Sequence, residues 1–315
     1  MALYLGIDGG GTKTECAVGD DAAILGRSKT GGSKVQRLGE QPARESLHEA
    51  IVQACQQARR DPGAITHACV GITGASNPQV RDTVRRIIAE VVPGQVDVVG
   101  DMIVGFEAAF PETSGLIVLA GTGSIVFGRN ERGETARAGG WGSAVSDEGS
   151  GDWIGRAGVA AALRAYDSGQ SNALIGGIMN AWHVATREDV ARVANASPPP
   201  DFAALFPLVL SSADRGDGMA RDILMRAGTE LATLSKVVMR RLWPGPHPIR
   251  VRISGGVFSN SFCVQQVFEN SVRAERPQCT VSFGQADGAA GALVCARRAA
   301  KAHAEDAVAA RHGAS

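Results

Sequence analysis

The fold is decided by the amino-terminal stretch, which reads Leu3-Tyr4-Leu5-Gly6-Ile7-Asp8-Gly9-Gly10-Gly11-Thr12-Lys13-Thr14. Its apolar first half predicts a buried strand, and the glycines after Asp8 predict a turn. Residues 13–18 keep no helical period, which predicts a second strand, and a turn at 19–21 leads to a third strand over 23–28. The chain is therefore expected to open with a β-meander built around a glycine loop.

Strands and helices alternate after this meander. The expected elements are a helix over 40–60, a strand over 65–72, a helix over 80–91, a strand over 96–99 and a helix over 102–110. Such alternation predicts a mostly parallel sheet that is covered on both faces. The strand over 96–99 is followed by Asp101, which we therefore expect at the carboxyl edge of the sheet.

The opening pattern begins again more than a hundred positions later. A buried strand over 116–120 ends in the small-residue turn Gly121-Thr122-Gly123-Ser124, and a second strand over 125–129 ends in a turn at 130–133. We interpret this as a structural duplication of two related β-rich halves. The alternative is that the two hairpins are unrelated.

The rest of the second half is largely helical. The expected helices are 153–165, 173–182, 188–195, 201–210 and a long one from 218 to about 242, which the proline-rich stretch 244–248 ends. A strand over 249–253 then ends in Ser254-Gly255-Gly256-Val257. A helix over 260–273, a short strand over 280–283 and a final helix from Asp287 complete the chain.

Composition restricts the class of protein. The 315 residues carry 32 basic and 32 acidic side chains and only 5% aromatic residues, which argues against nucleic acid or an anionic membrane as a partner. The stretch before Asp8 is too short for a signal peptide, and no apolar run could span a bilayer. The six cysteines form no C-x-x-C motif, which favours reduced thiols. We expect a cytoplasmic protein of two domains.

Two common nucleotide-binding motifs are excluded, because the residues and elements that follow the glycines do not match them. A P-loop needs a lysine directly after its second glycine and then a helix, but Thr12 separates Gly11 from Lys13 and a strand follows. A dinucleotide-binding glycine motif must open a helix, and neither glycine turn does so.

The glycine turns fit another kind of phosphate site. Glycines let backbone N–H groups approach phosphate oxygens, and threonine hydroxyls add donors. Asp8, at the end of its strand, can hold Mg²⁺ through water. The turn at 254–257 suits adenosine, because no side chain projects from its two glycines. The alternative for each turn is that its glycines only close a tight bend. The residues expected to contact the nucleotide on this basis are Gly9, Gly10, Gly11, Thr12, Lys13, Thr14, Gly121, Thr122, Gly123, Gly255 and Gly256.

Together, the glycine turn after Asp8 and the turns at 121–124 and 254–257 resemble those of the actin, sugar-kinase and heat-shock chaperone superfamily. They are most similar to those of the N-acetylglucosamine kinase and glucosamine kinase branch of the BadF/BadG/BcrA/BcrD ATPase family. The most specific piece is Gly139-Gly140-Trp141-Gly142-Ser143-Ala144-Val145-Ser146-Asp147-Glu148-Gly149-Ser150, which is similar to the sugar-kinase pattern G-G-W-G-x-x-x-x-D-E-G-S. The resemblance covers essentially the whole chain.

The resemblance implies an α/β fold of two duplicated actin-like (ribonuclease H-like) domains, with mixed sheets flanked by helices and a ligand cleft between the domains. We expect the domains at 1–110 and 111–315, with the final helix packing back on the first. It further implies ATP and Mg²⁺ as cofactors, a small-molecule sugar as substrate and a homodimer. Gly216 and Ser259 are two more expected contacts with ATP.

The resemblance also implies which residues bind the sugar and catalyse the transfer. Asp101 matches the family's general base, which binds the 6-hydroxyl of the sugar. Glu107 and Asp97 are carboxylates with the right chemistry for a base, but they are expected within a helix and within a strand. An N-cap role is the alternative for Asp101 and for Asp147, and a core position is the alternative for Trp141. The other expected sugar contacts are Ser33, Lys34, Ser124, Gly140, Trp141, Gly142 and Asp147.

One departure from the family leaves the substrate open. Lys34 stands where the family commonly has an asparagine, and a cation there suits an acidic sugar or a different hydroxyl pattern. N-acetylglucosamine, glucosamine and other hexoses all remain candidates. The rival class is an ATPase that activates a 2-hydroxyacyl-CoA dehydratase or a benzoyl-CoA reductase. Such activators carry cluster-binding cysteines in mid-chain, and the absence of cysteine between Cys69 and Cys263 disfavours that class.

Overall fold

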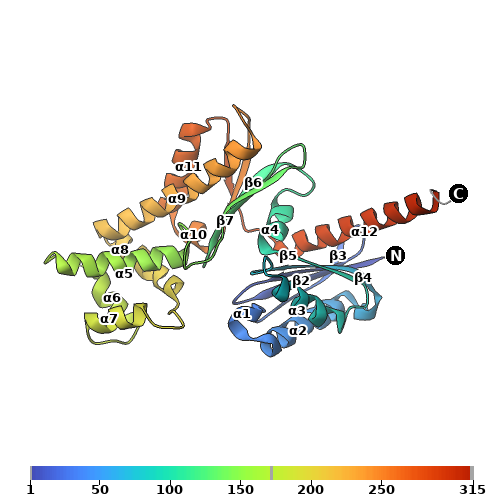
Figure 1. The fold of residues 1–315 in the computed structure, drawn as a ribbon, viewed down its shortest axis with the longest axis horizontal. Helices are drawn as coiled ribbons and strands as arrows, with labels where there is room; N and C mark the ends of the chain where they lie inside the picture. Colours follow the sequence, from blue (N-terminus) through green and yellow to red (C-terminus); the bar gives the residue numbers. More distant parts are fainter. Residues whose placement is uncertain (1, 171–172, 313–315) are drawn as a thin grey trace. The chain divides into compact units, whose positions relative to one another are not determined.

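The computed structural model describes residues 2–170 and 173–312, with side chains as far as 305. These residues form two compact units. Unit 1 comprises Met1–Glu112 and Ala286–Ser315, and unit 2 comprises Thr113–Gln285. Each unit contains one five-stranded sheet with helices packed on it (Figure 1). The expected α/β class with two mixed sheets is confirmed.

The sheet of unit 1 begins with the predicted meander. Its strands are β1 (Leu3–Gly9), β2 (Thr14–Gly19), β3 (Ile24–Thr30), β4 (Ile65–Ile72) and β5 (Gln95–Gly100), in the order β3-β2-β1-β4-β5. The first three strands are antiparallel, and β4 and β5 run parallel to β1. Because β1, β4 and β5 are parallel, their carboxyl ends meet at one edge, where Gly9 pairs with Ile72 and Ile72 with Gly100.

Helices cover both faces of this sheet, as the alternation of strands and helices predicts. They are α1 (Val35–Leu38), α2 (Glu40–Ala58), α3 (Pro78–Ala89), α4 (Asp101–Ala109) and α12 (Gly288–His312), with a 3₁₀ turn at Pro62–Ala64. Successive side chains of β1 point to opposite faces. Leu5 and Ile7 pack in the cluster that includes α2 and α3, whereas Tyr4 packs with Val104 of α4 and Leu293 of α12.

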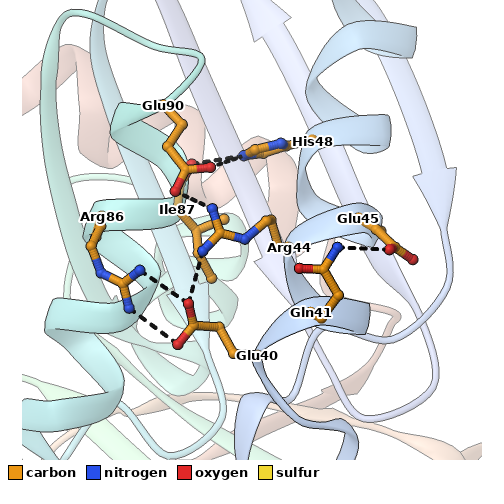
Figure 2. Close-up of polar contacts among 8 residues, drawn as sticks. All are labelled: Glu40, Gln41, Arg44, Glu45, His48, Arg86, Ile87 and Glu90. Carbon is orange, nitrogen blue, oxygen red and sulfur yellow. Dashed lines mark hydrogen bonds and ion pairs between the residues drawn. The ribbon is translucent and has the colours of Figure 1, made fainter.

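A polar network joins α2 to α3 on the outside of unit 1 (Figure 2). The guanidinium of Arg86 donates to both carboxylate oxygens of Glu40, at 3.0 and 3.1 Å. Arg44 also donates to Glu40, at 2.8 Å, and to Glu90 at the end of α3. The two arginines lower the pKa of Glu40. Because these charges face solvent, each pair contributes little to the stability of the fold.

Unit 2 repeats the topology of unit 1. Its strands are β6 (Gly115–Ala120), β7 (Ser124–Arg129), β8 (Thr135–Gly139), β9 (Arg250–Ser254) and β10 (Thr280–Phe283), in the order β10-β9-β6-β7-β8. Here too a meander of three strands is followed by two strands parallel to the first. The predicted duplication is confirmed.

One strand of this meander was missed. β8 was not predicted because its sequence, Thr-Ala-Arg-Ala-Gly, has no large apolar residue, and it forms an edge strand paired only with β7 among the described strands.

Unit 2 also contains helices, several of which contact its sheet. They are α5 (Gly151–Asp167), α6 (Ala173–Ala181), α7 (Arg187–Ala194), α8 (Phe206–Asp214), α9 (Gly218–Leu242), α10 (Gly256–Asn260) and α11 (Phe262–Glu275). The long helix α9 packs on β7 and β8 and buries Ile223, Leu231 and Val238, as predicted. No helix among the described residues is long and apolar enough to cross a membrane.

Two helix boundaries differ from the expectation. The helix expected over 201–210 is a 3₁₀ turn at Phe202–Leu205 followed by α8, since Asp201 caps the turn by accepting a hydrogen bond from the Ala204 N–H. The helix expected over 260–273 begins at Phe262, because the side chain of Ser261 accepts from the Val264 N–H and caps it.

A buried ion pair holds α12 against α4 and yields a stability prediction. Glu107 is 2% exposed and accepts two hydrogen bonds from Arg298, at 2.8 and 2.6 Å. Replacing Arg298 by Ala leaves the carboxylate buried without its cation. We expect a loss of about 3 kcal/mol, at the low end of the usual range because the guanidinium is partly exposed. Thermal or urea unfolding measures this loss.

The matched control is Arg192→Ala, which removes an exposed pair with Asp189 on α7. It should leave the free energy of unfolding nearly unchanged, because an exposed ion pair contributes little to stability. Equal losses in the two variants would show that burial of Glu107 does not govern the effect.

Candidate active site

Asp101 lies where the parallel strands of unit 1 end. It is the first residue of α4, and Gly100 occupies the N-cap position, so the N-cap alternative for Asp101 is wrong. Thr73 directly follows β4, and its hydroxyl donates to Oδ2 of Asp101 at 2.7 Å. The Met102 N–H donates to Oδ1 at 2.9 Å. These two donors hold the carboxylate in one orientation.

Asp8 is a second carboxylate of the same edge, at the end of β1. Burial raises its pKa to about 7, and the negative charges of Asp101 and Glu15 contribute to the rise, whereas Lys13 opposes it. Glu15 is the direct partner of Asp8 in the β1–β2 pair. Negative charge is therefore concentrated here beyond what the nearby ammonium group neutralises, which suits a divalent cation.

The donor set fits a hydrated Mg²⁺ rather than a closed protein cage. Within the described part of the chain, no three side chains of His, Cys, Asp or Glu come together as metal ligands. Mg²⁺ usually keeps several waters and takes one or two carboxylates together with substrate phosphates. Asp8 has the position and the charge for that role.

The first glycine loop connects β1 to β2 and packs against the segment after β3. The Ser33 N–H donates to the Gly10 carbonyl at 3.0 Å, and a Cβ atom placed on Gly9 would lie 2.5 Å from Oγ of Ser33. Thr14 and Ser33 are fully buried and joined by a hydrogen bond of 2.8 Å between their hydroxyls. Thr12 and Lys13 are exposed at the tip of the loop, and the Lys13 ammonium pairs with Glu15 at 2.9 Å.

Lys34 lies between this glycine loop and the turn after β4. It precedes α1, and its Cδ would lie 3.9 Å from a Cβ atom on Gly11. Two residues on, the side-chain amide of Gln36 would lie 2.7 Å from a Cβ atom on Gly74, the residue after Thr73. The structure thus brings Lys34 to the same loop cluster as Asp101 and Asp8.

The second glycine loop, between β6 and β7, contacts the amino end of α5. The carbonyls of Gly121 and Thr122 accept hydrogen bonds from the N–H groups of Gly151 and Asp152, at 2.8 and 3.1 Å. The turn after β9 reaches the same edge of the sheet, because β6 and β9 are parallel.

Gly255, in that turn, has a φ of +106°, and a Cβ atom there would lie 2.3 Å from the Ala120 carbonyl oxygen. Only glycine permits this approach. The two glycine turns predicted to bind nucleotide in this unit therefore adjoin each other.

Asp147 ties this loop to the segment that carries the sugar-kinase pattern. It has a φ of +64°, which is uncommon outside glycine and concentrates at functional sites. Burial raises the pKa of its carboxyl group, while hydrogen bonds from the backbone of Gly142 and Ser124 oppose the rise. Its Oδ2 would lie 2.9 Å from a Cβ atom on Gly123. The N-cap of α5 is Ser150, so the N-cap alternative for Asp147 is wrong.

Trp141 is exposed on this segment rather than packed in a core. Its side chain is 69% exposed, so the core alternative is wrong, and the Arg137 guanidinium lies 4.0 Å above the ring. Gly140 and Gly142 on either side have φ values of +69° and +102°. An exposed aromatic ring of this kind suits contact with a sugar. Ser124, also expected at the sugar, is buried, and its hydroxyl donates to the Glu148 carbonyl at 2.7 Å.

The remaining residues predicted to contact ATP lie in other elements of unit 2. Gly256 and Ser259 lie in α10, where the Ser259 hydroxyl donates to the Gly256 carbonyl at 3.2 Å. Gly216 lies in the turn between α8 and α9 with a φ of +96°. Their contacts with ATP stay predictions. Of the rivals to Asp101, Glu107 is bound to Arg298, and Asp97 lies on the exposed side of β5.

Sequence reasoning missed two polar residues of the carboxylate edge. The contact of the Thr73 side chain with Asp101 was not predicted, although the place of Thr73 directly after β4 was a usable signal. Asp287 precedes α12 and adds to the charges that raise the pKa of Asp8, but it comes from the far end of the chain. No local pattern connects it to the first strand.

The raised pKa of Asp8 predicts a stability effect that depends on pH. A carboxyl group whose pKa rises from 3.8 to about 7 on folding lowers the stability of the folded protein at pH values above 3.8. This loss of stability grows with pH until the pH passes about 7. Asp8→Asn removes this loss. The variant should match the parent near pH 4 and become more stable toward pH 7, by at most about 4 kcal/mol, with no further gain above pH 7.

Thermal unfolding from pH 4 to pH 8 measures this gap. The exposed Asp97→Asn variant serves as the control, and its melting temperature should follow that of the parent at every pH. A gap for Asp8→Asn that stays constant over the whole range would contradict the assigned burial of its charge.

Comparison with known proteins places this site in a family. A curated N-acetylmuramic acid/N-acetylglucosamine kinase of Clostridium acetobutylicum is 29% identical over 302 residues, covering 94% of this chain and 99% of its own length. An N-acetyl-D-glucosamine kinase of Dictyostelium discoideum is 28% identical over 76% of this chain and 80% of its own.

A solved structure from Chromobacterium violaceum, assigned as an N-acetylglucosamine kinase, superposes with a TM-score of 0.75 at 26% identity and covers 93% of this chain and 98% of its own. The resemblance noted from the sequence is confirmed. Residues 5–296 match the family model itself, and the chain therefore belongs to the BadF/BadG/BcrA/BcrD ATPase family.

Proposed function

We propose that this chain is an ATP-dependent kinase that phosphorylates the 6-hydroxyl of an amino sugar, with Asp101 as the general base. The observation that carries the proposal is the placement of Asp101 beside Asp8 at one sheet edge, with Thr73 and the Met102 N–H orienting Asp101. The names of the three relatives reported above, which are kinases of amino sugars, support the substrate class.

Each residue has a distinct role in this reaction. Bound Mg²⁺–ATP supplies the phosphoryl group and the cation that neutralises charge in the transfer. Asp8 holds the metal through water, and the glycine loops at Gly9–Gly11 and Gly121–Gly123 offer backbone N–H groups to the phosphates. The carboxylate of Asp101 accepts the proton of the sugar hydroxyl. The turn at Gly255 leaves room for the adenosine.

The sugar is held by the exposed segment around Trp141 and by the loops near Lys34. Trp141 offers a ring face, and Asp147 fixes the segment to the second glycine loop. The ammonium of Lys34 suits a carboxylate on the sugar. N-acetylmuramic acid carries such a group on its lactyl ether, which N-acetylglucosamine lacks.

The rival function, activation of a partner dehydratase or reductase, is not favoured. Those activators hold a metal cluster through cysteines. In the part of the chain that the structure describes, the cysteines form no disulfide, and no cluster of metal-binding side chains is present. The relatives reported above carry the names of sugar kinases.

The first test replaces the proposed base. Asp101→Asn keeps the size of the side chain but cannot accept the proton, so kcat should fall at least about a hundredfold. ADP binding should stay unchanged, because the phosphate loops are intact. A coupled assay of ADP release, run with N-acetylglucosamine, N-acetylmuramic acid, glucosamine, N-acetylmannosamine and glucose, measures both activity and substrate choice.

Asp97→Asn is the control for this test, because Asp97 lies on β5 four residues earlier and faces solvent. It should leave kcat within about twofold of the parent. Full activity in Asp101→Asn would disprove the role of the base.

The second test addresses the sugar. Lys34→Gln removes the cation and keeps a polar side chain of similar length. If Lys34 binds a sugar carboxylate, kcat/KM for N-acetylmuramic acid should fall about tenfold, since a hydrogen bond between charged groups contributes about 1.5 kcal/mol or more. The value for N-acetylglucosamine should change far less.

Lys301→Gln, on the exposed side of α12, should alter neither value. An equal loss for both sugars in Lys34→Gln would assign Lys34 to the nucleotide or to the loop instead.

A further inference from the structure

The first residue of the final helix lies against the carboxylate of Asp8. A Cβ atom placed on Gly288 would lie 2.1 Å from Oδ2, 2.5 Å from Cγ and 2.8 Å from Cβ of Asp8. The Cβ of Asp8 is fixed by the backbone of β1, so a turn of the carboxylate alone cannot relieve such a clash. Any side chain at 288 must move either Asp8 or the start of α12.

The start of α12 is held in place by Asp287. Its Oδ1 accepts a hydrogen bond from the Ala290 N–H at 3.0 Å, and its Oδ2 pairs with Arg27 of β3 at 2.8 Å. Two turns further on, Arg297 donates to the carbonyls of Asp20 and Ala23 at 2.7 and 2.9 Å. The helix therefore cannot simply slide away from Asp8 without breaking these contacts.

The same helix touches the element that carries Asp101. A Cβ atom on Gly291 would lie 1.9 Å from the Val104 carbonyl oxygen, so α12 and α4 are in backbone contact there. Two turns along, Arg298 binds Glu107 of α4 through two hydrogen bonds. Because α4 begins with Asp101, its packing on α12 sets where that carboxylate stands.

A third contact fixes α12 to β1. A Cβ atom on Gly6 would lie 2.3 Å from the Leu293 amide nitrogen and 2.4 Å from the Ala289 carbonyl oxygen. Gly6 precedes Asp8 by two residues on the same face of the strand. The helix thus lies on the strand that ends in Asp8 and on the helix that begins with Asp101.

Building on the proposed function, we propose that α12 positions both carboxylates of the active site. Gly288 sets the place of Asp8, and the packing at Gly291 with the Arg298–Glu107 pair sets the place of Asp101. None of these α12 residues needs to contact sugar or ATP for this role. They are positioning residues, and they come from a segment that follows the whole of unit 2 in the chain.

The main experiment compares Gly288→Ala with Gly218→Ala. Gly218 is the matched control, because it is also the first residue of a long helix and also follows an aspartate, but a Cβ there meets nothing within 4 Å. Calorimetry measures ADP binding with and without Mg²⁺. In Gly288→Ala we expect affinity with Mg²⁺ to fall about tenfold or more, and affinity without Mg²⁺ to stay within about twofold. Gly218→Ala should behave as the parent.

A double-mutant cycle with Asp8→Asn shows whether Gly288 acts through Asp8. If it does, Gly288→Ala should add no further loss of Mg²⁺-dependent ADP binding once Asp8 is Asn. Losses that multiply would overturn the proposal, and so would parent-like Mg²⁺ dependence in Gly288→Ala. Circular dichroism and thermal unfolding check that each variant is folded.

A milder variant tests the second contact. Arg298→Lys keeps the positive charge but cannot bind Glu107 through two parallel hydrogen bonds. We expect kcat to fall about tenfold with the KM for sugar and the affinity for ADP unchanged, because only the orientation of Asp101 is affected. The fall should vanish in an Asp101→Asn background. An equal fall in that background would overturn this part of the proposal.

These readouts separate the two proposals. A parent protein that phosphorylates none of the sugars would refute the proposed function. The calorimetric comparison of Gly288→Ala and Asp8→Asn would still decide whether α12 positions Asp8, because it needs nucleotide and metal but no sugar.

Discussion

The burial of the Asp8 carboxyl group beside the charge of Asp101 is the constraint on which the strand-end edge of unit 1 depends. Both carboxylates stand at the ends of parallel strands, and burial together with their mutual charge keeps the pKa of Asp8 near neutrality. A fold selected for stability alone would replace at least one of them. Their retention is the pattern expected of a site that a cation and a phosphate chain complete. Thr73, Lys13 and the start of α12 are arranged around this charge.

The duplicated topology supports two different kinds of chemistry. In unit 1 the edge where the parallel strands end carries ionisable groups, whereas in unit 2 the equivalent edge carries glycines whose backbone groups are free of side chains. Gly255 approaches the end of β6 so closely that a methyl group would collide with it. Parallel strand ends collect ligand-binding loops in open α/β sheets generally. In the proposed reaction, the same arrangement of strands therefore places carboxylates beside a glycine loop in one unit and two glycine turns side by side in the other.

Much of the fold could be predicted from local sequence, and the reasons are visible in particular elements. Strand β1 is apolar throughout before Asp8, and α9 repeats buried residues at helical spacing, so both were predictable. β8 was not, because an edge strand of small residues carries no such signal. The contact of Gly288 with Asp8 joins residues at opposite ends of the chain, which no local pattern encodes. Trp141 and Asp147 were found through their motif, while their exposure and left-handed backbone required the structure.

Because the chain is synthesised from its amino terminus, α12 is made after the strands and helices of unit 1 on which it packs. Tyr4, Cys69 and Val104 are made early, yet the apolar cluster that buries them includes Ala292, Leu293 and Ala296. That side of the first sheet stays uncovered until α12, which follows the whole of unit 2 in the chain, has been made. A nascent or truncated chain therefore presents an open hydrophobic surface, a state that chaperones and proteases recognise. The kinase proposed here therefore acquires its reactive groups in final form only after the whole of unit 2 has been made.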